Sequence, residues 1–286
     1  MLRGCRHGFT RVLREYAMKP IQPYFALCAS RYFKRIIRAD GIAHIYGYVC
    51  DHPLNNTTTA VPDSCIDIVF DSDGSNITAQ VCGTVLKHKT ILNEQGHEYF
   101  GVRFVPGVSP AILNARFPDF IDYQIDLADC VKDKTLAERI MTCGTFTEKA
   151  DVFLNFYRKS LCCFTDDEAK NNLVNAVKSK IISSYGNIRM ETIEDYTGYG
   201  RRYIDHVFKD NTGLQPKTFC RIVRFQNTID HLDHDNNITI SDLAVDHGYF
   251  DQPQFIRDFE YFTGMTPRSY RRMIIGDNYT DKFILS

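Results

Sequence analysis

The sequence predicts an α+β protein in which a small β-rich domain is followed by an all-helical domain. The first observation is a series of short alternating runs that ends near Leu127. The second is a change to helical spacing of the apolar residues from Asp129 onward. The third is a helix-turn-helix pattern that occurs twice in the last third of the chain, which indicates an internal repeat.

The composition is that of a globular protein with two cores. The 286 residues are 44% hydrophobic, and no apolar run reaches the length of about eighteen residues that spans a membrane. Ten cysteines occur without CxxC pairs or a secretory signal, so we expect reduced thiols and a cytoplasmic location. The adjacent Cys162 and Cys163 are either a sensor of redox state or of a thiophilic metal, or two small buried residues.

Residues 1–17 are basic and lack the apolar run of a secretory signal. We expect a disordered leader. An amphipathic targeting segment and a translation start at Met18 are the alternatives.

Residues 18–128 are expected to form a small barrel or sandwich, because no helix separates the strands. The expected strands are IAHIYGYVC, CIDIVFD, NITAQVCGTV, HEYFGVRFV and FIDYQIDL, with DSDGSN as a turn. In the second run Ile66, Ile68 and Phe70 share one face, as expected for a strand with that face in a core.

The β-rich region lacks the spacing of a metal or catalytic site. Metal ligands must converge on one ion, but His44, His52, His88 and His97 show no close His-x-His pattern. A nucleophile elbow, a Walker loop and a dinucleotide fingerprint are also missing from the sequence. We therefore expect no enzyme, no cofactor and no metal site.

Arg103 and Asp67 are the candidate ligand-binding residues of this region. A strand arginine such as Arg103 could hold the carboxylate of an anionic or aromatic effector by bidentate contact. The interpretation that we favour is that Arg103 pairs with Asp67 or another internal acid for structural reasons.

Residues 129–165 change to a helical pattern with a break at Gly144. In the segment after the break, Leu154, Tyr157 and Leu161 share one broad apolar face. The helix therefore either docks on the chain's own β-rich domain or joins two copies of the chain as a dimer.

Residues 166–275 are expected to form the helical domain, which begins at the acidic residues Asp166, Asp167 and Glu168. In its first helix-turn-helix unit, Gly198 lies at the turn and a second helix runs from Arg201 to Lys209. We call the second helix of each unit its reading helix. Ile204 and Phe208 are the buried positions of the first reading helix.

The second unit runs from Ile240 to Arg272. Ser241 is the expected N-cap of its first helix and Gly248 the left-handed residue at its end. The reading helix starts near Asp251 and buries Phe255, Phe259 and Phe262. Both units close with Thr-Gly-x-x-Pro, about fifty residues apart.

A linker helix from Pro216 to Leu232 is expected between the units, because its apolar residues form one stripe. Its length is roughly 25 Å, and one turn of DNA is roughly 34 Å. One monomer could therefore read two successive major-groove segments. After Ile275, residues 276–286 look like a tail.

The paired units, the linker helix and the phrases GYFDQPQFIRDF and PKTFCRIVRFQ resemble the AraC/XylS family of bacterial transcriptional regulators. The phrases VPDSCIDIVF and GVRFVPG resemble the cupin-like sensor domain of one subgroup. The resemblance implies promoter or operator DNA as partner, and it allows RNA polymerase, a small effector and a second copy of the chain. Departures from the family pattern occur at Gly200, His206 and Pro253-Gln254, where glycine and proline still suit a helix start.

The reading helices supply the candidate DNA-binding residues. Arginine can pair with guanine or phosphate, aspartate with cytosine and glutamine with adenine. The outward positions are Arg201, Arg202, Asp205, His206, Lys209, Gln252, Gln254 and Arg257. The net charge of −1 counts mildly against binding to phosphates. A solvated mixed-charge face and a protein-interaction scaffold that retains the helix-turn-helix module are therefore the alternatives.

Overall fold

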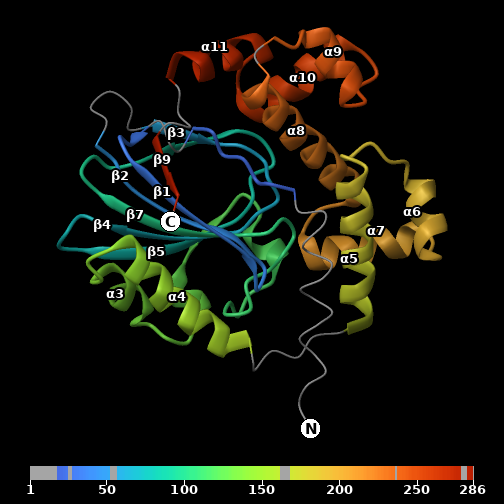
Figure 1. The fold of residues 1–286 in the computed structure, drawn as a ribbon. Coiled ribbons are helices and arrows are strands. Elements are labelled where there is room, and N and C mark those ends of the chain that lie inside the picture. Colours follow the sequence, from blue (N-terminus) through green and yellow to red (C-terminus); the bar gives the residue numbers. More distant parts are fainter. Residues whose placement is uncertain are drawn as a thin grey trace.

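The computed structural model describes residues 18–24, 28–51, 57–161, 168–235, 237–277 and 282–285. A β-rich domain is followed by a helical domain, so the predicted α+β class is confirmed (Figure 1). The expected leader at 1–17, the pair Cys162-Cys163 and the acids Asp166 and Asp167 lie outside the described residues.

The β-rich domain is built on one seven-stranded sheet of order β8-β5-β4-β7-β2-β1-β9. All neighbours pair antiparallel except β1 and β9. The strands are β1 (Tyr32–Ala39), β2 (Ile42–Val49), β4 (Asp67–Ser72), β5 (Ile77–Cys82), β7 (Glu98–Phe104), β8 (Gln124–Asp126) and β9 (Phe283–Leu285). A second sheet pairs β3 (Thr57–Ala60) with β6 (Lys89–Leu92).

The predicted strands are found at four of the five expected places, and three details differ. The hydrogen bonds among the described strands form two separate sheets instead of one closed barrel. The segment expected as the strand FIDYQIDL begins within the 3₁₀ helix η2 (Phe117–Phe120) and pairs only at β8. The expected tail returns as β9 to the edge of the sheet, beside β1 (Figure 1).

One face of the large sheet is covered by the helices α2 (Leu127–Cys130), α3 (Leu136–Met141) and α4 (Phe146–Leu161). Phe153 of α4 lies 6.4 Å from Phe70, and Tyr157 lies 5.4 Å from Phe104, between ring centroids. The broad face of α4 is therefore docked on the chain's own sheet, which is the first of the two alternatives for residues 129–165.

Seven helices form the described helical domain. They are α5 (Glu168–Ser183), α6 (Met190–Thr197), α7 (Arg201–Thr212), α8 (Pro216–His234), α9 (Ile240–Asp246), α10 (Gln252–Thr263) and α11 (Pro267–Asp277). The reading helices are α7 and α10, and α8 runs between the two groups of shorter helices (Figure 1). Thr239, and not Ser241, caps α9, because its hydroxyl accepts the backbone N–H of Asp242.

The repeated Thr-Gly-x-x-Pro phrase is the C-terminal cap of each reading helix. The hydroxyl of Thr212 donates to Phe208 O at 2.8 Å, and that of Thr263 donates to Phe259 O at 2.7 Å. The glycines that follow adopt φ angles of 69° and 77°, a left-handed conformation that side chains disfavour. The prolines then begin α8 and α11, where a missing N–H has no cost.

The two domains share apolar contacts. Buried tyrosines of β1 and β2 belong to the same core cluster as Phe225 of α8 and Phe255 of α10. The rings of Tyr24 and Tyr270 meet at 6.2 Å, and Met18 packs with the first unit. Within the described ranges, no helix is both long and apolar enough to cross a bilayer.

Candidate functional site

The first reading helix, α7, presents a charged face to solvent. Gly200 is its N-cap and has an extended backbone. No side chain caps the backbone N–H groups of the first turn. Ile204 and Phe208 are buried within the first unit, as helical spacing predicts, and Val207 is buried beside them. The exposed side chains of this helix include Arg201, Arg202, His206 and Lys209.

Asp205 lies on the same face but is half-buried. Its carboxylate is 3.6 Å from Nε of Arg201, one helical turn earlier. Because both side chains are partly exposed, the contribution of this pair to stability is small. The guanidinium can exchange the carboxylate for a base edge or a phosphate, whereas the carboxylate can accept only from a donor on a base edge.

The second reading helix, α10, begins with a side-chain cap. Asp251 Oδ1 accepts the backbone N–H of Gln254 at 2.6 Å. Gln254 Oε1 accepts the N–H of Phe250 at 2.9 Å, so this amide already caps the helix start. Gln252 and Arg257 are exposed, whereas Phe255, Phe259 and Phe262 are buried as predicted.

An ion pair joins α10 to the linker helix. Arg221 of α8 donates to Asp258 Oδ1 at 2.9 Å, and its guanidinium lies 5.2 Å from the ring centroid of Phe262. Arg221 therefore connects the linker helix to α10 and helps to orient it.

Exposed aromatic residues flank both reading helices and were missed in the sequence. Phe250 is 92% exposed just before α10, and the rings of Tyr199 and Tyr203 stack at 5.1 Å at the start of α7. The signal was an aromatic residue shortly after the turn glycine in both units, as in GYG and GYF. Such groups can contact thymine methyls or sugars.

The β-rich domain contacts the C-terminal part of α7. Arg116, just before η2, donates to Asp210 Oδ1 at 3.1 Å. A shallow hollow of about 180 Å³ there is lined by Arg116, Pro118, His206, Lys209 and Asp210. Two of the predicted DNA-binding residues, His206 and Lys209, therefore lie beside the β-rich domain.

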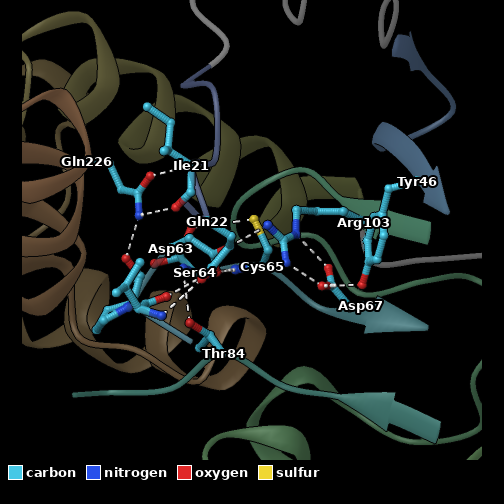
Figure 2. A network of polar contacts seen from close by, with 12 residues as sticks. Ile21, Gln22, Tyr46, Asp63, Ser64, Cys65, Asp67, Thr84, Arg103 and Gln226 are labelled. Atoms are coloured by element: carbon cyan, nitrogen blue, oxygen red, sulfur yellow. Dashed lines mark hydrogen bonds and ion pairs between the residues drawn. The ribbon is translucent and has the colours of Figure 1, made fainter. Parts of the chain in front are cut away.

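Arg103 and Asp67 form a buried ion pair on neighbouring strands. Nε of Arg103 donates to Asp67 Oδ1 at 2.8 Å, a second guanidinium nitrogen donates to Oδ2, and Asp63 lies 3.5 Å away. The pairing of Arg103 with Asp67 that the structural interpretation expects is present (Figure 2), and a ligand-binding role of the two residues stays a prediction. Burial raises the pKa of Asp63, and the charge of Arg103 opposes that rise.

The same residues line a cavity between the two sheets. Side chains of β2, β4, β5 and β7 form one wall, and β3 and β6 form the other. Its volume is about 210 Å³, which leaves room for several ordered waters. Among the described residues, no cluster of three or more histidine, cysteine or acidic side chains could hold a metal ion.

Two family models match the chain. One is described as a helix-turn-helix domain and matches residues 193–273. The other is described as a domain of unknown function (DUF6597) and matches residues 39–126. The two matches fall on the helical domain and on the β-rich domain.

Regulators are found among similar curated proteins. The F1 operon positive regulatory protein of Yersinia pestis is 29% identical over 101 residues, which is 35% of this chain and 33% of that protein. The probable transcription factor PqrA of Proteus vulgaris is 25% identical over 35% of this chain and 81% of its own length. The match thus spans about a third of the Yersinia protein.

Two solved structures match part or most of the chain. ToxT from Vibrio cholerae covers 81% of this chain and 97% of its own, at 10% identity and a TM-score of 0.42. The C-terminal domain of AraT, a response regulator from Geobacillus stearothermophilus, covers 35% and 84%, at 20% identity and a TM-score of 0.33.

Proposed function

We propose that this chain, which belongs to the AraC/XylS family, binds promoter or operator DNA sequence-specifically and regulates transcription there. The observation that carries the proposal is the pair of matched reading helices. Each buries its apolar face, ends in the same threonine-glycine cap and exposes arginine on the opposite face. A protein that binds bacterial promoter DNA acts in the cytoplasm, which is the compartment that we propose.

We further propose that one chain reads two successive major-groove segments. The linker helix α8 has 19 residues, which gives a length of roughly 28 Å. That length is close to the repeat of roughly 34 Å between adjacent major grooves. Apolar contacts and the Arg221–Asp258 pair fix the second unit on α8, which supports a defined spacing.

The residues that we propose as DNA contacts fall into two groups. Arg201, Arg202, Gln252 and Arg257 are exposed near the starts and outer faces of the reading helices, where base edges are read. His206 and Lys209 lie farther along α7 beside the β-rich domain, and we assign them to phosphates. Asp205 and Gln254 contribute after leaving their present intramolecular partners.

A random DNA pool tests the proposal. The purified chain is used for several rounds of selection at physiological salt, and the bound DNA is sequenced. We expect a motif of two blocks about one helical turn apart, on the order of ten base pairs. Variants Arg202→Ala and Arg257→Ala should each erase a different block.

A protein-interaction scaffold remains the alternative, and the same selection distinguishes it. The scaffold predicts no enriched motif and only weak binding that disappears with added salt. A single enriched block would instead leave DNA binding in place and contradict the two-segment proposal. Control by a small effector, RNA polymerase contact and dimer formation are further parts of the proposed regulator.

A further inference from the structure

The hollow between η2 and the C-terminal part of α7 is lined by basic residues from both domains. Arg116 of the β-rich domain lines it together with His206 and Lys209 of α7, and Asp210 is its acidic lining residue. All four residues are exposed. Neither His206 nor Lys209 has an ion-pair partner among the residues that the structure describes. The hollow therefore offers an anion more positive than negative charge, on a surface that a large partner can reach.

Local structure fixes the position of Arg116 without using its side chain. Phe117 and Phe120 of η2 are buried in the core of the β-rich domain. Asp119 Oδ2 accepts the backbone N–H of Arg116 at 3.0 Å. The side chain of Arg116 is 69% exposed, so a guanidinium on a fixed backbone is able to change its partner.

The segment of η2 is held close to the end of α7. Gly213, which ends α7, has a φ of 69°, and a Cβ there would be 2.3 Å from Ile121 Cδ1 and 3.0 Å from Pro118 Cα. Such a close approach requires glycine. Arg116 therefore keeps a defined place beside α7, although it belongs to the other domain.

The hollow continues the face of α7 that we propose as DNA-reading. Arg202, His206 and Lys209 are exposed and follow one another at spacings of four and three residues, so they share one side of the helix. Lys209 follows Arg202 by seven residues, a rise of roughly 10 Å. The major groove is roughly 12 Å wide. When Arg202 meets base edges, Lys209 and the hollow therefore reach the rim of the groove, where the phosphates lie.

The present partner of Arg116 is easily replaced. Its guanidinium donates to Asp210 Oδ1 at 3.1 Å, and the two side chains are 69% and 52% exposed. Exposed pairs of this kind contribute little to stability. A phosphate offers arginine a bidentate, charge-assisted contact, and at this place it would also lie beside Lys209. Exchanging the carboxylate for a phosphate is therefore favourable.

We propose that Arg116 of the β-rich domain completes, with His206 and Lys209 of α7, a two-domain site for one phosphate of the DNA backbone. The inference rests on the proposed function, because it requires α7 to lie in the major groove. It adds a DNA contact from outside the helix-turn-helix domain, and it makes Asp210 a competitor of the DNA for Arg116.

The salt dependence of DNA binding by the full chain tests the site. The logarithm of the affinity falls linearly with the logarithm of the salt concentration, by about 0.9 for each phosphate contact. Arg116→Gln should reduce this slope by about one contact on specific and non-specific DNA alike. It should weaken binding by about threefold to fivefold, whereas Arg116→Lys should retain the slope. An unchanged slope in Arg116→Gln would overturn the inference, and specific binding by the wild type would leave the proposed function standing.

The matched control is Arg139→Gln. Arg139 is an exposed arginine of the β-rich domain that also pairs with an aspartate, and Figure 1 shows its helix α3 far from α7. The substitution removes the same charge, but it should leave both the slope and the affinity unchanged. An equal reduction of the slope in the two variants would reduce the effect to net charge and overturn the site.

Asp210→Asn distinguishes a phosphate contact from a clamp between the domains. The carboxylate competes for Arg116 and repels a phosphate, so its removal should strengthen DNA binding by about twofold to threefold. Asp129→Asn, an exposed acid outside the hollow, should leave the affinity unchanged. If the Arg116–Asp210 pair only held the domains together, both Arg116→Gln and Asp210→Asn would weaken binding at an unchanged slope, and the inference would be wrong.

Single neutral methylphosphonates in the selected DNA locate the contact. Replacing each phosphate in turn around the block read by α7 should weaken wild-type binding at a particular position. Arg116→Gln should lose clearly less at that position, because the guanidinium and the phosphate form one interaction and their removals are not additive. Equal losses in wild type and variant at every position would overturn the inference. If the wild type binds no DNA at all, the proposed function is wrong and this inference fails with it.

Discussion

Gly213 and Gly264 end the two reading helices in the same left-handed conformation, and both lie against the β-rich domain. A Cβ at Gly213 would be 2.3 Å from Ile121 Cδ1, and one at Gly264 would be 3.0 Å from the His88 ring. His88 also lies 3.1 Å from the carbonyl oxygen of Tyr261, near the end of α10. The β-rich domain therefore contacts equivalent points of the repeat, so a change within it can reach both reading helices.

Gly213→Ala should destabilise the chain more than Gly198→Ala. Both glycines have positive φ, but Gly198 has no atom within 4 Å of a built Cβ. Left-handed strain alone costs roughly 1–2 kcal/mol, and overpacking against Ile121 adds about 1–3 kcal/mol. Urea unfolding of the two variants measures the difference. Equal costs would mean that Gly213 is not held against the β-rich domain.

Arg202→Ala and Arg257→Ala should each weaken specific DNA binding by about 1–3 kcal/mol. Both arginines are exposed on reading helices, so their loss should leave the fold intact. Fluorescence anisotropy with the selected DNA site measures the affinity. The control is Arg139→Ala, which removes a comparably exposed arginine of α3 that pairs with Asp133. Unchanged affinity at either position would remove that arginine from the interface.

Asp258→Asn should reduce affinity for the DNA block read by α10 and leave the other block unaffected. The Arg221–Asp258 pair is half-exposed, with 42% and 21% of the side chains accessible. We therefore expect a stability loss of at most about 1 kcal/mol. Binding to sites with one block scrambled separates the two effects. A uniform loss over both blocks would indicate global destabilisation.

Arg103→Met should be strongly destabilising, by roughly 3–5 kcal/mol, because it leaves two carboxylates buried without their cation. The double variant Arg103→Met/Asp67→Leu removes one uncompensated charge and should recover much of that loss. Thermal and urea unfolding at pH 7 compare the variants. A double variant less stable than Arg103→Met would show that the Asp67 carboxylate does not destabilise the fold when Arg103 is missing.

Acid should destabilise the second helix-turn-helix unit through His247. Burial and the neighbouring His231 lower the pKa of His247 to about 4, whereas an unfolded histidine titrates near 6.5. Between these values the unfolded chain binds more protons, so stability rises with pH and falls on acidification from pH 6.5 to 4. His247→Gln should flatten this dependence of the melting temperature, whereas the exposed His206→Gln should retain it. If the melting temperatures of the two variants depend on pH in the same way, the dependence does not arise from His247.

Much of the helical domain could be predicted because its signals are local. Phe255, Phe259 and Phe262 are buried at helical spacing, and Asp251 caps the helix that follows it. The cap of α9 was misplaced by two residues because Thr239 and Ser241 are both good caps, and the choice depends on which hydroxyl meets a free N–H.

The β-rich domain was less predictable. β3 and β6 are only four residues long each and rich in threonine and lysine, so their alternation is too short to detect. β9 lies about 250 residues from its partner β1 in the sequence, and no local pattern specifies a pairing at that separation.

The sequence by itself determined the helical repeat, the positions of the reading helices and the apolar face that each one buries. These features follow from residues three or four positions apart, whose spacing on a helix is fixed by its geometry. Only the tertiary structure decided that Gln226 meets Ile21 and Pro62, that Gln254 is used as a cap, and that Arg103 lies between Asp63 and Asp67. Such contacts depend on how distant segments pack, because a polar group removed from water must find its partner wherever the fold provides one.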